Sequence, residues 1–181
     1  MDKKKKISKF VLVLIVVTHI VFFVPSVVKT SLNIGIKNKY GIGYKIVYSK
    51  LSSMAELEKE RWENKGSYVV TSGYNCWFVA NKKDKIIFQI WDYSTVPSTD
   101  IEDYSTGVDE KKLEIAKKII SKLNNKTDYY YLNYLSENPS YYSFDFYCVN
   151  RFDILLGKIG EDSQKRVTGR IGKDFRNLDL Y

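Results

Sequence analysis

The feature of this 181-residue chain that most constrains its fold is a run of apolar residues close to its start. Residues 10–28 read FVLVLIVVTHIVFFVPSVV and carry no formal charge when the histidine is neutral. At about 1.5 Å per residue, a helix of this length just crosses a hydrocarbon layer roughly 30 Å thick. The pattern therefore predicts a transmembrane signal-anchor helix over residues 10–28, with the membrane as the partner of this segment.

The residues around the apolar run predict its orientation. Lysines crowd residues 1–9, and basic residues are retained on the cytoplasmic side. We expect residues 1–9 to be a basic cytoplasmic tail, the protein to be a single-pass protein of the cell membrane, and its domain to lie outside the cytoplasm. A signal peptide cleaved after Ser26, which would leave a secreted protein, is the alternative. The apolar run continues through Val28, and this favours the anchor.

The rest of the chain has the size and composition of one folded domain. Roughly 150 residues follow the apolar run, and 15% of the chain is aromatic, mostly because of fifteen tyrosines. Half of the net charge of +8 belongs to the first 28 residues, and the remaining lysines are scattered. Because no arginine-rich stripe or RNA-binding motif is present, we expect no nucleic-acid partner.

Hydrophobic periodicity and turn residues predict an α+β fold. We expect a linker and first strand over residues 29–48, a domain over residues 49–160 and a polar tail over residues 161–181 that is frayed or forms a terminal hairpin. One helix is expected over residues 53–65, and a second begins near Thr106 and Asp109 and ends at Asn124. The expected strands are residues 67–72, 75–81, 85–94, 129–135, 140–150 and 151–160.

The expected elements follow the order helix-βββ-helix-βββ, which suggests a tandem duplication. At the level of element order alone, residues 50–160 resemble the tandem helix-plus-sheet modules of PepSY-type extracytoplasmic proteins. This resemblance implies a binding or inhibitory module.

The residue inventory limits the chemistry that the domain can perform. His19, the only histidine, lies inside the apolar run, so catalytic triads with histidine and histidine-bound metals are excluded from residues 29–181. We therefore predict no catalytic residue, no cofactor and no metal. Five acidic residues around the second helix leave open calcium binding or a carboxylate-dependent enzyme acting on cell-envelope polymers; they are Asp100, Glu102, Asp103, Asp109 and Glu110. A solvated loop and helix start is the simpler interpretation.

Cys76 and Cys148 lie in apolar, aromatic segments. In an oxidising compartment they could form one disulfide, provided that their Cα atoms lie within about 7 Å of each other. Two buried thiols are the alternative.

Aromatic residues supply a candidate binding surface for a glycan or a peptide. Alternation along a strand sends half of them inward, so only the outward half can form a binding face. The candidate binding residues are Trp77, Trp91, Tyr130 and Tyr142. The leading hypothesis is a membrane-anchored, non-enzymatic binding or inhibitory module for an unknown protein or envelope partner.

Overall fold

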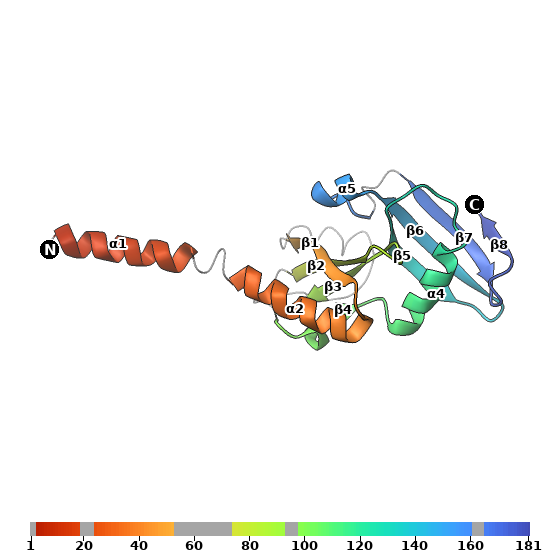
Figure 1. The fold of residues 1–181 in the computed structure, drawn as a ribbon, viewed down its shortest axis with the longest axis horizontal. Coiled ribbons are helices and arrows are strands. Elements are labelled where there is room, and N and C mark those ends of the chain that lie inside the picture. Colours follow the sequence, from red (N-terminus) through yellow and green to blue (C-terminus); the bar gives the residue numbers. More distant parts are fainter. Residues whose placement is uncertain (1–2, 19–23, 53–73, 93–97, 161–164) are drawn as a thin grey trace, which may run out of the picture.

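The computed structural model describes residues 3–18, 24–52, 74–92, 98–160 and 165–181 (Figure 1). In these segments the helices are α1 (Lys3–Thr18), α2 (Val24–Tyr40), α4 (Glu110–Ile120) and α5 (Arg151–Leu155), with a short 3-10 helix, η2 (Ile101–Asp103). The strands are β1 (Tyr44–Ser52), β2 (Tyr74–Asn81), β3 (Ile86–Asp92), β4 (Ser105–Thr106), β5 (Tyr129–Glu137), β6 (Tyr141–Val149), β7 (Arg166–Gly172) and β8 (Leu178–Leu180).

All eight strands form one sheet in the order β1-β2-β3-β5-β6-β7-β8, with β4 paired to β3 beside this path. Strands β1 to β3 are antiparallel to one another, and so are β5 to β8. The two groups meet where β3 and β5 pair in parallel. Parallel neighbours need a long crossover, and the chain makes it through η2, β4 and α4.

The sheet has one face covered by α2 and α4, here called the helix face. Because strand residues alternate between faces, each strand contributes every second side chain to this core. Its cluster combines Leu32 and Ile36 of α2 and Ile119 of α4 with strand residues such as Phe88 and Phe146. On the opposite face, Ile154 of α5 joins a smaller apolar cluster of strand residues.

The predicted transmembrane helix is wrong. Among the helices that the structure describes, none is both long enough and apolar enough to cross a membrane. Residues 10–28 are divided between α1, which ends at Thr18, and α2, which begins at Val24. Val28 is only 3% exposed and packs in the core of the helix face, so the end of the apolar run belongs to the domain.

Helix α2 also replaces the linker that was expected before the first strand. Its residues Val28, Leu32, Ile36 and Tyr40 recur every fourth position and are all buried against the sheet. Gly41, at a φ of 97°, ends the helix with a conformation that side chains rarely adopt. The single-pass α+β architecture is therefore corrected to a mixed α/β fold with one continuous sheet.

The predicted strand over residues 151–160 is also wrong, because α5 occupies its start. The N–H of Asn150 donates to the carboxylate of Asp153 at 2.8 Å, and the N–H of Arg151 donates to Asp128 at 3.1 Å. These bonds satisfy backbone groups at the beginning of a helix, which a strand pattern does not reveal.

The segment that was expected to be a polar tail supplies strands β7 and β8 at the end of the sheet. The predicted strands at 75–81, 85–94, 129–135 and 140–150 correspond to β2, β3, β5 and β6, and the second predicted helix corresponds to α4. His19, the predicted helix at 53–65 and the predicted strand at 67–72 lie outside the described residues.

Candidate functional site

Strands β3 and β5 diverge soon after they begin to pair, so the two strands are adjacent over only a short part of their length. Their parallel ladder consists of the pairs Ile86–Tyr130 and Ile87–Tyr131. Further along β3, the short strand β4 takes the neighbouring position, with Trp91 opposite Ser105. Beyond the ladder, the described residues pair β5 with β6 only. The edge of β5 that faces away from β6 is therefore open to another strand.

A cleft of about 280 Å³ lies at this divergence. We call it the β3–β5 cleft. Its lining comes from β3, the start of α4 with the loop before it, and β5: Gln89, Trp91, Gly107, Val108, Lys112, Tyr131, Leu132, Asn133, Tyr134, Leu135 and Ser136.

Hydrogen bonds hold the β3 and β5 side chains of the cleft in place. The hydroxyl of Tyr131 donates to Oε1 of Gln89 at 2.6 Å, and Nε2 of Gln89 lies 3.0 Å from the sulfur of Cys76. At the α4 end, the Lys112 ammonium donates to the carbonyl oxygen of Gly107 at 2.9 Å. These polar groups are positioned before any ligand arrives, which lowers the entropic cost of binding.

The β5 side of the cleft is exposed. A β-bulge between Leu132 and Tyr134 shifts the register of β5 against β6, and Tyr134 is 54% exposed. Asn133, at the bulge, donates from its amide to Asp145 at 2.9 Å. No described residue hydrogen-bonds the Tyr134 hydroxyl, so this group is available to a ligand. β-bulges commonly re-aim side chains beside functional sites.

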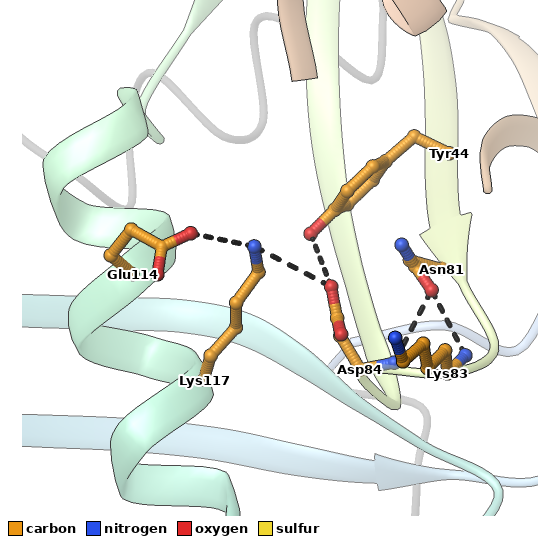
Figure 2. A network of polar contacts seen from close by, with 6 residues as sticks. All are labelled: Tyr44, Asn81, Lys83, Asp84, Glu114 and Lys117. Atoms are coloured by element: carbon orange, nitrogen blue, oxygen red, sulfur yellow. Dashed lines mark hydrogen bonds and ion pairs between the residues drawn. The ribbon is translucent and has the colours of Figure 1, made fainter. Parts of the chain in front are cut away.

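A second polar cluster joins α4 to the opposite end of β3 (Figure 2). The Tyr44 hydroxyl donates to Asp84 at 3.0 Å, and the Lys117 ammonium lies 3.5 Å from Asp84 and 2.7 Å from Glu114. In the turn itself, Oδ1 of Asn81 accepts hydrogen bonds from the backbone N–H groups of residues 83 and 84.

One ammonium group lies between two carboxylates in this cluster. Burial, together with the bond to Asp84, raises the pKa of Tyr44 far above its ordinary value, so the hydroxyl stays protonated and donates. Burial alone would lower the pKa of Lys117, but its contacts with Glu114 and Asp84 outweigh this and raise it. Because these groups pair with one another, the cluster fastens α4 to the β2–β3 hairpin and is a structural feature.

The structure brings one of the four predicted binding aromatics to the cleft. Trp91 is partly exposed and lines it. The other three lie on the helix face and are at most 9% exposed: Trp77, Tyr130 and Tyr142. Gln89 was missed, and Tyr134 was considered for an aromatic face but was not among the four chosen residues. The sequence shows which residues alternate along a strand, but it does not show which of the two faces borders a cleft.

The two cysteines are free thiols, so the predicted disulfide is not formed. Cys76 lies in the apolar cluster on the α5 side of the sheet and Cys148 in the core of the helix face. Strands β3 and β5 lie between β2 and β6, and Cys76 is opposite Trp91 whereas Cys148 aligns with Ile86, five residues away on β3, so the two sulfur atoms cannot meet. Burial raises the pKa of Cys148, which keeps this thiol protonated and unreactive.

The acidic residues proposed for catalysis or calcium binding do not meet in the cleft, whose described lining contains no carboxylate. Asp100 caps η2 and Asp109 caps α4, each through a hydrogen bond to a backbone N–H. Glu102 contacts Lys39 at 3.3 Å, Glu110 is exposed at the start of α4, and the side chain of Asp103 lies outside the described residues. No group of three or more potential metal ligands gathers in the described segments.

Comparison with known proteins adds no family: no protein-family model matches the chain, and no curated protein or solved structure is significantly similar to it.

Proposed function

We propose that the protein is a non-enzymatic binding module that takes up an extended segment of a partner protein along the open edge of β5. The observation that carries this proposal is the divergence of β3 and β5 after two paired residues. An extended peptide can add to such an edge through its main-chain hydrogen bonds, while pockets beside the edge select its side chains.

The size of the cleft supports this mode of binding. At about 280 Å³ it is slightly smaller than the sites of roughly 300–1,000 Å³ that enclose small molecules. It therefore suits one or two side chains of a strand whose backbone pairs outside it. Trp91 and Tyr134 offer aromatic surface, and the buried Leu132 lines the same cleft, so we expect the partner segment to insert an apolar or aromatic side chain.

Peptide display on phage, with the full chain as bait, tests the proposal. Selected peptides are synthesised and their dissociation constants measured with the wild type and with Trp91→Ala and Tyr134→Ala variants. We expect each variant to weaken binding by about tenfold, the effect of losing one aromatic anchor at an interface. Phe152→Ala is the control, because Phe152 on α5 is 67% exposed and is not among the residues that line the cleft.

N-methylation of the peptide backbone then tests strand addition. It removes main-chain donors while leaving the side chains unchanged, so methylation at alternate positions should abolish binding and methylation at the intervening positions should not. Equal binding by all methylated peptides, or by the cleft variants, would overturn the proposal.

An enzymatic activity on envelope polymers and the location of the domain outside the cytoplasm remain untested predictions.

A further inference from the structure

Helix α1 exposes an unusual amount of apolar surface. Every residue from Phe10 to Val17 is apolar, and their exposed fractions run from 46% to 70%. Figure 1 shows α1 extending away from the sheet, beyond the start of α2. Exposed apolar surface of this extent marks a site of association.

The distribution of this surface indicates which environment covers it. Over these eight positions α1 has no polar face, so its apolar side chains point in all directions around the helix axis. A second helix or a protein groove would cover one stripe and leave the rest in water. Lipid chains surround a helix on all sides, and a helix that is apolar all round is stable in such an environment.

Length and charge indicate how α1 would lie in lipid. Eight residues of helix measure about 12 Å, less than half of a hydrocarbon layer roughly 30 Å thick. Lysines at positions 3, 4, 5, 6 and 9 precede the apolar residues. Lysines at one end of an apolar helix stay in the headgroup layer and are attracted to anionic lipids.

On the C-terminal side of α1, helix α2 packs on the sheet and exposes less apolar surface. Helix α2 buries Val28, Leu32 and Ile36 against the sheet, and of its described large apolar side chains Val27 and Ile34 are exposed, at 43% and 57%. The uncovered apolar surface of the N-terminal helices is thus concentrated on α1. We propose that α1 inserts into one leaflet of an anionic membrane and holds the domain at the membrane surface.

Sedimentation of the full-length protein with lipid vesicles tests this. We expect binding to vesicles of equal parts phosphatidylglycerol and phosphatidylcholine, and weaker binding to phosphatidylcholine alone. Leu14→Glu places a charge in the middle of the apolar stretch and should lower partitioning at least tenfold, since inserting a charge into hydrocarbon is costly. Ile42→Glu is the matched control, because Ile42 is 96% exposed but lies between α2 and β1; it should bind as the wild type does.

Two results would overturn the inference. One is equal vesicle binding by Leu14→Glu and the wild type. The other is a dimer in sedimentation equilibrium without lipid that Leu14→Glu abolishes while vesicle binding stays absent, which would make a second copy the occupant. Because neither experiment involves the β3–β5 cleft, failure here leaves the peptide-binding proposal intact.

The depth of insertion gives an independent test. Tryptophan introduced in place of Leu14, in the middle of the apolar stretch, should be quenched by lipids brominated in the acyl chain, whereas tryptophan in place of Ile42, between α2 and β1, should not. The signal of the native tryptophans is subtracted with the wild type. Equal quenching at positions 14 and 42, or no acyl-chain quenching at position 14, would contradict insertion.

Discussion

Asp145 is a buried carboxylate with several hydrogen bonds on the face of the sheet opposite the helix face. Its side chain is only 5% exposed and accepts bonds from Arg166 at 2.6 and 2.5 Å, from Asn133 at 2.9 Å and from Thr168 at 3.2 Å. The paired fork of Arg166 matches the carboxylate geometry. Because Asn133 belongs to the bulge beside the cleft, this network also holds the β5 side of the cleft in position.

The stability of the protein should depend on pH through Asp145. Burial alone would raise the pKa of this carboxyl, but the bonds from Arg166, Asn133 and Thr168 outweigh it and hold the pKa below the ordinary 3.8. The folded state therefore favours the ionised form. The resulting stabilisation is fully present above the unfolded pKa and is lost as pH falls through the folded pKa.

Asp145→Asn tests this dependence. At pH 7 we expect the variant to lose about 1.5 kcal/mol of unfolding free energy, the lower end for bonds to a charged group because Arg166 is largely exposed. The difference, measured by urea denaturation, should shrink below about pH 4 as the wild-type carboxyl is protonated. Asp179→Asn, at an exposed site on β8, should change stability by less than about 0.5 kcal/mol. A constant difference between pH 7 and pH 2.5 would contradict the assignment.

At the scale of elements, the spacing of apolar residues predicts helix α2, although the first of these residues also belongs to the apolar run that suggested a transmembrane helix. Val28, Leu32, Ile36 and Tyr40 are spaced by four, as on one face of a helix. The segment looked like a linker because it contains glycines. Gly35, however, lies inside the helix, where a Cβ atom would come within 2.8 Å of Ile101, so close packing against η2 explains this glycine.

Two isoleucines of α2 provide a matched test of its place in the domain. Ile36 is fully buried against the sheet, whereas Ile34, on the same helix, is 57% exposed. We expect Ile36→Ala to lower the free energy of unfolding by about 2–5 kcal/mol through lost burial and a cavity. Ile34→Ala should change it by less than about 0.5 kcal/mol. Equal effects in urea denaturation would mean that α2 does not pack on the sheet.

Elements with strong local patterns could be predicted, and those that depend on distant partners could not. Strands β2, β3, β5 and β6 are rich in aromatic and β-branched residues, and α4 has an apolar stripe with an acidic cap at Asp109. Strand β7 has only two apolar side chains, Val167 and Ile171, and its remaining inward position is Gly169. Its position depends on pairing with β6. Across this pair, the guanidinium of Arg170 on β7 lies 5.0 Å from the centre of the Tyr141 ring on β6.

At the scale of the whole molecule, the candidate site could be predicted only in part. Trp91 was identifiable as a candidate from its residue type. The cleft itself comes from the divergence of β3 and β5, whose pairing partners are more than forty positions apart in sequence. No local pattern encodes such a divergence, since it depends on the crossover through η2, β4 and α4. The open edge of β5 could therefore be identified only from the structure.

The two antiparallel groups should nevertheless unfold together. Their parallel ladder is short, but α4 contacts both: Lys117 lies beside Asp84 of the β2–β3 turn, and Lys111 pairs with Glu137 of β5. The core of the helix face is one cluster that reaches from α2 to β7. Unfolding either group would thus expose apolar surface of the other.

A single cooperative transition is the expected outcome. Urea unfolding followed by tryptophan fluorescence, to which Trp77 and Trp91 contribute, should share its midpoint with unfolding followed by circular dichroism. Amide exchange should give the same free energy for Ile90 in β3 and Phe146 in β6, both fully buried. Ile119→Ala in α4 should lower both values equally, by about 2–5 kcal/mol. Separate midpoints, or a variant that destabilises only one group, would show that the parallel junction is a boundary between two folding units and that the β3–β5 cleft lies between them.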